Sequence, residues 1–388
     1  MRDLGRHGHA VIGIGRDSNA LAGTSRYCTA HFVRDVGEDA LITQIGQLAD
    51  QFHASYLLAI SESDLTLINR HRDSLQQFLT PLTPTADALA KVLDKPTCQS
   101  IAGEVGLSYP VTYSPRSVTD LAGMTNLPFP AVLKWADPNE VAPALAAAGL
   151  ELEKARIVLN RAELDEYIAR FEPIGQLPMI QEYCHGHGIG HMFLARDGEI
   201  LFEFQHERIH EWPPEGGVSA LCRSMPLEEE VEARRQSRKL INHLRWTGVA
   251  MVEYRFDPDR KTWKFLEING RFWGSLPLAV AVNVPFASSL VSAIGENQKI
   301  PNFQQNYPNR FCMFWIPETK RLMRILFRPK LISDPHFRVR PFAELASYLS
   351  YLLRPSTQFY VFTRDDPRPF FRDMMSVGKK VINGLLRR

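Results

Sequence analysis

Residues 266–275 read Leu-Glu-Ile-Asn-Gly-Arg-Phe-Trp-Gly-Ser, and this stretch decides how the rest of the chain is interpreted. Side chains two positions apart on a strand point to the same face, so Glu267 and Asn269 lie together, and Arg271 joins them if the strand continues that far. Proteins usually hold Mg2+ with one or two carboxylates plus the phosphates of a bound substrate, and a transferred phosphoryl group needs a cation beside it. The stretch therefore predicts a magnesium-nucleotide site.

A second acidic strand precedes this one. Residues 249–256 and 263–268 are strand-like and flank a turn-rich segment, which is the pattern of a β-hairpin. The hairpin places Glu253 opposite Glu267, and two facing carboxylates repel each other unless a cation lies between them. We therefore predict that Glu253, Glu267 and Asn269 bind Mg2+ or Mn2+. The alternative is an ordinary surface hairpin whose acids face water.

The order of motifs along the chain resembles the ATP-grasp superfamily, whose nucleotide fold occurs in carbamoyl-phosphate synthase, biotin carboxylase and D-alanine–D-alanine ligase. Glu-Ile-Asn-Gly-Arg at 267–271, followed by Trp-Gly-Ser, looks like its metal-binding end. Asp-Lys-Pro-Thr at 94–97 is similar to the entry into its nucleotide domain, and Phe-Pro-Ala-Val-Leu-Lys at 129–134 resembles its lysine-bearing strand. Pro-Met-Ile-Gln-Glu-Tyr-Cys at 178–184 resembles its hinge strand. Only the combined order of these motifs is specific.

The resemblance implies a set of ligands for ATP. Lys95 and Lys134 would bind the phosphates, and Gln181, Glu182, Tyr183 and Cys184 of the hinge would line the adenine pocket. A lysine at the end of an apolar strand is a point charge suited to phosphate, although a strand-end lysine can also reach solvent.

The resemblance also implies catalytic and substrate residues. Arg271 and Lys134 would be the catalytic residues, with Arg271 stabilising the charge on the transferring group. Gln205, Arg208 and Ser219 lie in a polar strand and glycine turn that would border the acceptor, with a solvated strand edge as the alternative.

Two stretches depart from the family pattern. Residues 136–150 lack the glycine-rich loop that covers the phosphates in many relatives, so we expect a shorter or helical cover. Residues 185–191 (His-Gly-His-Gly-Ile-Gly-His) lack the acid that often holds the ribose. Their three histidines suggest zinc, but the glycines weaken a regular strand and no cysteine or carboxylate completes a ligand set. We interpret the segment as a loop near the nucleotide.

The predicted domains are a small N-terminal domain (1–93), a two-lobed ATP-grasp core (94–296, hinge near 178–184) and a basic, mainly helical extension (297–388). In the first, strand-like 10–15 and 56–61 alternate with helix-like 40–52 and 65–79, which is typical of a parallel sheet. It resembles the family's pre-ATP-grasp domain, except that the chain opens inside a helix, so we expect its first strand to be missing. The fold class is thus α/β, or more narrowly the α+β ATP-grasp type.

The chain has 388 residues, of which 45% are hydrophobic, enough for two or three domains. Its five cysteines show no paired spacing, which favours reduced thiols and a cytoplasmic setting. The first residues do not form a signal peptide, and no window of eighteen uncharged apolar residues follows.

The formal net charge of +2 hides an uneven distribution. Residues 316–388 contain fifteen Lys or Arg and six Asp or Glu. Basic amphipathic helices are predicted at 320–330, 345–353 and 370–386, and such helices either lie on anionic lipid or pack as a cap on the core. We expect packing for 320–353, with Leu345, Leu349, Leu352 and Leu353 as the packed stripe, and we leave both alternatives open for 370–386. No nucleic-acid module accompanies the charge, and we expect no nucleic-acid partner.

Together these features predict a cytoplasmic ligase of the carboxylate-amine class. In the family mechanism a carboxylate attacks the γ-phosphate of ATP, and an amine or similar nucleophile then displaces phosphate from the acyl phosphate. The alternatives are an ATP-grasp kinase or carboxylase, or a catalytically weak nucleotide-binding adaptor at the inner membrane surface. The expected partners are a small carboxylate and an amine, whose identities the sequence does not reveal, as it does not reveal the oligomeric state.

Overall fold

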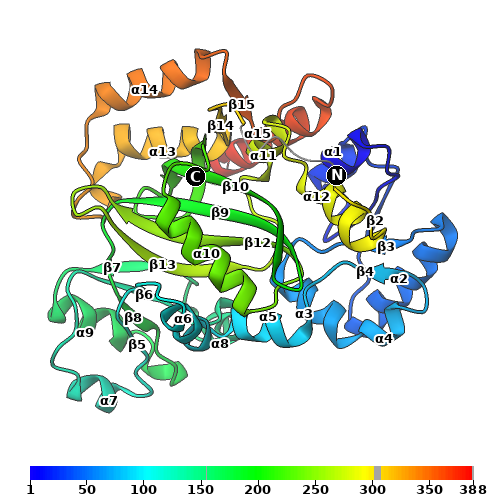
Figure 1. Ribbon diagram of the computed structural model, residues 1–388. Coiled ribbons are helices and arrows are strands. Elements are labelled where there is room, and N and C mark those ends of the chain that lie inside the picture. The colour runs from blue at the N-terminus through cyan, green and yellow to red at the C-terminus, as the bar shows by residue number, and fades with distance from the viewer. Residues whose placement is uncertain (154, 301–306, 387–388) are drawn as a thin grey trace.

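The computed structural model describes residues 1–153, 155–300 and 307–386. Figure 1 shows three bodies around a central antiparallel sheet: the N-terminal region in blue, a small lobe in cyan and green, and the C-terminal region in orange and red. The α+β architecture predicted from the sequence is confirmed.

The N-terminal region contains parallel strand pairs, but the two predicted strands lie in separate two-stranded sheets and each pairs with a strand that was not predicted. Its elements are α1 (Arg2–Arg6), β1 (Ile12–Gly15), η1 (Leu21–Thr24), β2 (Ala30–Val33), α2 (Glu38–Phe52), β3 (Tyr56–Leu57), α3 (Glu62–Arg70), α4 (Arg72–Leu75), β4 (Thr80–Pro81) and α5 (Ala86–Leu93). β1 pairs with β2 and β3 with β4. The strand predicted at 56–61 ends early because Ser61 caps α3 by accepting a hydrogen bond from the backbone N–H of Asp64.

The small lobe is a four-stranded antiparallel sheet in the order β5-β8-β6-β7. It follows α6 (Lys95–Glu104) and consists of β5 (Thr112–Tyr113), α7 (Val118–Gly123), β6 (Ala131–Lys134), α8 (Pro138–Ala147), β7 (Arg156–Val158), α9 (Arg161–Ala169), η2 (Glu172–Ile174) and β8 (Met179–Glu182). Its apolar core includes Leu133, Leu145 and Ile180. The helix α8 occupies the stretch without the glycine-rich loop, so this stretch is helical, and its role as a cover of the phosphates stays a prediction.

The central sheet has seven strands in the order β13-β12-β9-β10-β11-β14-β15. Its first part comprises β9 (His187–Arg196), β10 (Glu199–Trp212), β11 (Val218–Met225), α10 (Val231–His243), β12 (Gly248–Asp257) and β13 (Thr262–Asn269). The predicted hairpin is confirmed, because Glu253 pairs with Glu267 across β12 and β13. The helix α10 packs on one face of the sheet (Figure 1).

The other face of this sheet is partly covered by α11 (Leu276–Ala281), α12 (Phe286–Leu290) and a π-helical turn, η3 (Val291–Gly295). Met192, Phe204 and Met251 pack there with Leu278 and Phe286. The two carboxylates of the hairpin lie on this same face, because Met251 is two residues from Glu253.

The C-terminal region extends the central sheet across the predicted boundary at residue 296. It contains β14 (Phe311–Met313), α13 (Trp315–Phe327), η4 (Pro329–Leu331), α14 (Pro341–Leu353), β15 (Thr357–Phe359) and α15 (Arg368–Leu386). β14 pairs with β11 in antiparallel orientation, and β15 pairs with β14 in parallel orientation. No helix among the described residues is both long and apolar enough to span a membrane.

The packing predicted for the leucine stripe of α14 is wrong. Leu345, Leu349 and Leu353 are exposed, and of the four leucines only Leu352 is half-buried. The opposite face is the packed one, because Tyr348 is buried and its hydroxyl accepts a hydrogen bond from Trp315 Nε1 of α13 at 2.6 Å. α14 packs on α13 through Tyr348 and on β14 through Tyr351, whose ring centroid lies 5.0 Å from that of Phe311, and the stripe faces outward.

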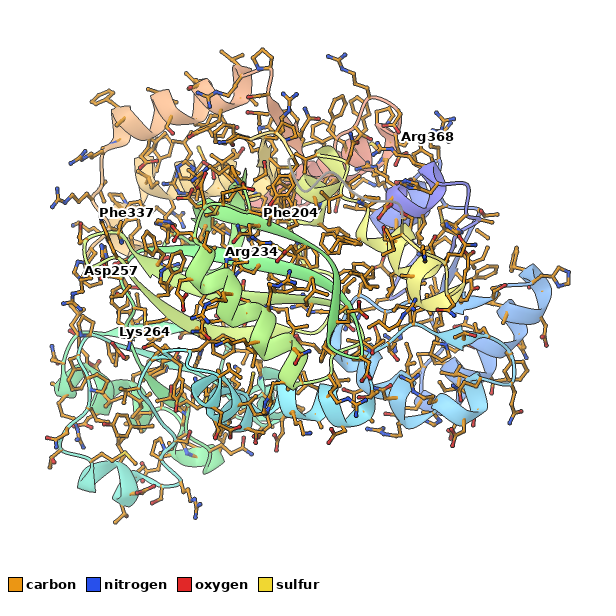
Figure 2. The ribbon with its side chains drawn as sticks, in the orientation of Figure 1. Phe204, Arg234, Asp257, Lys264, Phe337 and Arg368 are labelled. Atoms are coloured by element: carbon orange, nitrogen blue, oxygen red, sulfur yellow. The ribbon has the colours of Figure 1, made fainter. Side chains whose placement is uncertain are left out.

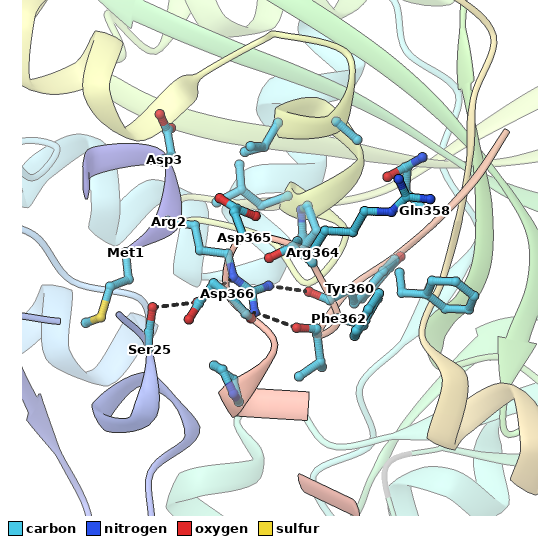
Figure 3. Close-up of a pocket in the computed structure, with 18 of the residues that line it drawn as sticks. Met1, Arg2, Asp3, Ser25, Gln358, Tyr360, Phe362, Arg364, Asp365 and Asp366 are labelled. Atoms are coloured by element: carbon cyan, nitrogen blue, oxygen red, sulfur yellow. Dashed lines mark hydrogen bonds and ion pairs between the residues drawn. The ribbon is translucent and has the colours of Figure 1, made fainter. Parts of the chain in front are cut away.

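A polar seam joins the two ends of the chain (Figure 3). Asp366 accepts hydrogen bonds from Arg2 at 2.8 Å and from Ser25 at 2.6 Å, and Asp365 pairs with Arg6 at 2.7 Å. A cavity of about 890 Å³ lies beside this seam, between α1, α11 and the segment after β15. Because the acids at its wall are already paired with cations of the N-terminal region, we assign the seam a structural role.

Candidate functional site

Two lysines meet where β6 of the small lobe approaches α6. Lys134 ends β6, and Lys95 begins α6, whose first turn is fixed because Asp94 accepts a hydrogen bond from Thr97 N at 2.9 Å. The Lys95 ammonium donates to the carbonyl of Trp135 at 3.3 Å. This contact holds Lys95 at the end of the strand that carries Lys134.

The Lys134 ammonium lies in an environment that disfavours its charge. Burial lowers the pKa of Lys134 to about 8, the Glu267 carboxylate opposes this change, and Lys95 adds to it. Lys134 therefore lies near a cation from α6 and a carboxylate from the seven-stranded sheet. Such a charge is stabilised when an anion binds beside it.

The predicted metal ligands are brought together. Glu253 and Glu267 are direct partners on adjacent strands, and Asn269 lies two residues farther on the same face. The Glu267 carboxylate has no hydrogen bond or ion pair within the described part of the chain, and it is not fully buried. Asn269 Oδ1 accepts one hydrogen bond, from Arg271 at 2.9 Å, which leaves it one lone pair. These oxygen donors fit Mg2+ or Mn2+.

The Arg271 side chain lies at the same place, as predicted. Besides Asn269, it faces Glu62 at the start of α3, with 3.4 Å between Nε and Oε1. Burial raises the pKa of Glu62, Arg271 opposes this rise, and the nearby Glu267 adds to it. Glu62 was not predicted as a site residue, since nothing local in its helix-start pattern indicates that it faces a strand about two hundred residues later in the chain.

A network of two arginines and two acids extends the site along β10 and β12. Arg208 contacts Glu253 and donates to Glu211 at 3.2 Å, and Arg255 pairs with the other oxygen of Glu211 at 2.6 Å. Burial raises the pKa of Glu211, but Arg255 and Arg208 outweigh it, so the carboxyl titrates below its usual range. Arg208 is thus placed beside the predicted metal ligands. Arg255 was missed, although its position two residues after Glu253 was a usable signal.

Two glycines of the 185–191 tract make room for this network. A Cβ atom on Gly188 would lie 2.8 Å from Cδ of Arg208, and one on Gly190 would lie 2.7 Å from Nε2 of His206. His206 is buried, bonds to Ser275 through Nδ1 at 2.8 Å, and has its pKa lowered by burial and by Arg208. From His187 onward the tract is strand β9, with small residues at the site, and only residues 185–186 lie outside the strand.

The three histidines of this tract do not converge. His185 lies near Asp259, His187 pairs with Glu207 at 3.0 Å, and His191 bonds to Ser237 of α10 at 2.8 Å. Burial lowers the pKa of His191 to about 3, so this ring is neutral. Within residues 1–153, 155–300 and 307–386, no group of three or more His, Cys, Asp or Glu is placed to hold a metal.

The hinge residues lie between the two sheets. Figure 2 shows Lys264 at the edge of the central sheet next to the small lobe, where its ammonium lies 3.4 Å from Glu182. The Glu182 carboxylate also accepts from Val111 N at 3.0 Å, so the structure ties it to the chain between α6 and β5. Gln181 donates to Thr112 Oγ1 at 2.9 Å.

The next two hinge residues, Tyr183 and Cys184, also contact other parts of the protein. The Tyr183 hydroxyl donates to Asp334 at 2.7 Å, and its ring stacks on His336 with 5.6 Å between centroids. The Cys184 carbonyl accepts from Arg255 at 3.4 Å, and burial raises the pKa of its thiol to about 11. The side chains of Glu182 and Tyr183 are therefore engaged with protein groups, and the adenine role of the hinge stays a prediction.

Two of the predicted substrate residues are not brought to the carboxylates. Gln205 precedes His206 on β10, so it points to the opposite face, where its amide donates to the carbonyls of Pro226 at 2.9 Å and Glu229 at 3.1 Å. Ser219 is buried, and its hydroxyl lies beside Cys222 and Tyr360. Of this group, the structure places only Arg208 at the site.

A four-stranded antiparallel lobe beside a larger, mainly antiparallel sheet is the architecture of the ATP-grasp fold, and this chain has that fold. No family model and no curated protein sequence matches the chain. Three similar solved structures are ATP-grasp enzymes.

An L-amino acid ligase from Bacillus licheniformis has 17% identity and a TM-score of 0.56, with 75% of this chain and 69% of that chain covered. A biotin carboxylase complex with β,γ-ATP from Campylobacter jejuni has 14% identity and a TM-score of 0.58, with 80% and 70% covered. An ADP complex of N5-carboxyaminoimidazole ribonucleotide synthetase has 15% identity and a TM-score of 0.59, with 84% and 83% covered.

Proposed function

We propose that the protein is an ATP-dependent ligase that activates a small carboxylate as an acyl phosphate and transfers it to an amine or similar nucleophile. The observation that carries this proposal is that Lys134 of the small lobe and Glu267 of the central sheet lie within electrostatic range of each other. A lysine whose charge is disfavoured in the free protein lies near an oxygen donor without a protein partner. A phosphate group bound beside Lys134 would pair with its ammonium, and Glu253 and Glu267 would remain available to bind metal.

In this proposal, different residues contact the phosphates, the transferring phosphoryl group and the metal. Lys95 and Lys134 bind the phosphates of ATP and neutralise charge on the leaving ADP. Arg271 lies beside Asn269 and contacts the transferring phosphoryl group, in place of its weakest partner, Glu62, whose carboxylate lies 3.4 Å from Nε. Its other two nitrogens donate to the carbonyl of Phe272 and to Asn269, which hold the guanidinium in place. Glu253, Glu267 and Asn269 would hold Mg2+ or Mn2+, and the bound ion would supply charge neutralisation at the phosphates.

Arg208 is the residue we assign to the substrate carboxylate. Its guanidinium is shared between Glu253 and Glu211, so it is held in one orientation near the metal ligands. Glu211 also pairs with Arg255, so Arg208 shares this acid with a second cation and keeps charge with which it can pair with a substrate carboxylate. No side-chain nucleophile is needed, since the substrate oxygen attacks the γ-phosphate directly.

The structural neighbours support the ATP-dependent use of a carboxylate at a coarse level, because they include an amino acid ligase, a biotin carboxylase and a ribonucleotide synthetase. The Cys28, Cys98, Cys184, Cys222 and Cys312 thiols are free. Free thiols support the cytoplasm as the compartment.

The test is ATP-dependent phosphate release by the purified protein with Mg2+, first with single amino acids and other carboxylates and then with amine mixtures. We expect release that requires one carboxylate, and amide product when the amine is added. Glu267→Gln should lower turnover on the order of a hundredfold while keeping the melting temperature. Turnover unchanged in Glu267→Gln would contradict the metal assignment. ADP formation that requires bicarbonate alone would identify a carboxylase instead.

A further inference from the structure

The outward face of α14 has the composition of a buried surface. Phe342 is 90% exposed, Leu353 76%, Leu349 45% and Leu345 38%. These four residues recur at helical spacing, so they form one stripe along the helix. The other exposed residues of α14 are Ala343, Ala346 and Ser350. A helix on a protein surface normally exposes charged residues, and this exposed face has none.

The charged residue of α14 is turned away from this stripe. Glu344 pairs with Arg321 of α13 at 2.9 Å, and Arg321 is buried. The one charged residue of α14 is therefore used in packing against α13, and the exposed stripe contains no charged residue. Figure 1 shows α14 at the outer margin of the molecule, beside α13. Its inner face also contacts β14 and β15 at the edge of the central sheet.

Cations without acidic partners precede this helix. Arg328 and Lys330 follow α13, and Arg338 and Arg340 lead into α14; all four are exposed. None of the four forms an ion pair within the described residues, and the acid of this segment, Asp334, accepts a hydrogen bond from Tyr183. The surface around the N-terminal end of the stripe is thus positively charged.

We propose that the outward face of α14, with the four cations of residues 328–340, docks the protein on an anionic lipid surface. Apolar side chains that project between acyl chains with cations at the headgroup level are the arrangement of interfacial helices. The charges favour this occupant over a second copy of the chain, because a two-fold contact would place the same four cations against each other.

The experiment measures sedimentation of the full-length protein with phosphatidylcholine vesicles, with and without phosphatidylglycerol. We expect binding that requires phosphatidylglycerol and falls as salt rises. The double variant Phe342→Ser with Leu349→Ser should bind on the order of a hundredfold more weakly. The double variant Arg338→Glu with Arg340→Glu should lose more than about tenfold at low ionic strength.

Matched controls lie on α10. Val231→Ser removes an apolar residue that is 56% exposed, and Lys239→Glu reverses an exposed cation. Both should bind vesicles as the unchanged protein does. All variants should keep their melting temperature, because the changed side chains face solvent.

Three results would overturn the proposal. The first is full-length protein that ignores phosphatidylglycerol vesicles at low salt, and the second is equal binding to vesicles without phosphatidylglycerol. The third is a dimer, detected by light scattering, that the Phe342→Ser with Leu349→Ser variant dissociates while vesicle binding is absent. This last result would assign the face to self-association.

Discussion

Replacing Lys134 with methionine should make the free protein more stable and weaken its nucleotide binding at the same time. The pKa of Lys134 is lowered by burial from 10.5 to about 8. At about 1.36 kcal/mol per pH unit, the folded protein at neutral pH bears a cost of up to about 3 kcal/mol for holding this charge. Methionine keeps the aliphatic stem and removes the charge.

The pH dependence follows from the same difference. Between pH 8 and 10.5 the unfolded chain holds a proton on this lysine that the folded protein has released, so the free energy of unfolding rises with pH in this window. The variant should lack this rise. Bound polyphosphate favours the protonated lysine, so nucleotide affinity of the unchanged protein should fall as pH rises above about 8.

The assays are urea unfolding at several pH values and calorimetric titration with a non-hydrolysable ATP analogue. At neutral pH we expect the variant to bind the analogue roughly tenfold to a hundredfold more weakly, the range for a charged hydrogen bond. Lys239→Met, on the exposed side of α10, is the control and should change neither quantity. Equal analogue affinity in Lys134→Met would refute the phosphate assignment, and a lower stability would refute the desolvation reasoning.

Two further predictions concern the metal site and the seam between the chain ends. Asn269→Ala removes one oxygen donor and should lower magnesium-dependent ATP turnover by tenfold or more without unfolding the protein. The control is Asn126→Ala, at an exposed position, which should leave turnover unchanged. An unchanged magnesium requirement in Asn269→Ala would exclude Asn269 as a ligand. Asp366→Asn should cost about 3 kcal/mol of unfolding free energy at neutral pH by urea titration, because it breaks a buried pair with Arg2. Burial raises the pKa of Asp366, but hydrogen bonds from Ser25, the Arg26 N–H and Arg2 outweigh burial, so the pKa is below its usual value. The stabilisation should therefore be lost as pH falls below about 4. The control is Asp165→Asn, which removes an exposed ion pair with Arg161 and should change the free energy of unfolding by less than about 0.5 kcal/mol. Equal effects of Asp366→Asn and Asp165→Asn would contradict the prediction that the buried pair contributes more.

The sequence by itself determined the features that rest on local periodicity. The alternation along residues 249–269 was enough to predict the hairpin and to place Glu267 and Asn269 on one face, because a strand repeats every two residues. The exact partner of Glu253 depends on a β-bulge between Glu253 and Tyr254, because the register at the turn, continued unchanged, would pair Glu253 with Leu266. The alternating elements of the N-terminal region and the three C-terminal helices were predicted for the same reason. The order of the motifs also indicated the ATP-grasp fold correctly.

Only the tertiary structure decided which surfaces face each other. Glu62 contacts Arg271, and Lys134 comes within electrostatic range of Glu267, across elements far apart in the chain, and no short-range pattern encodes such proximity. Gln205 was misplaced because a polar residue on a strand does not reveal which of the two sheet faces holds the site. The stripe of α14 was misjudged because apolar spacing shows that a helix has an apolar face, while burial depends on whether a neighbouring element covers that face. Here α13 covers the other side.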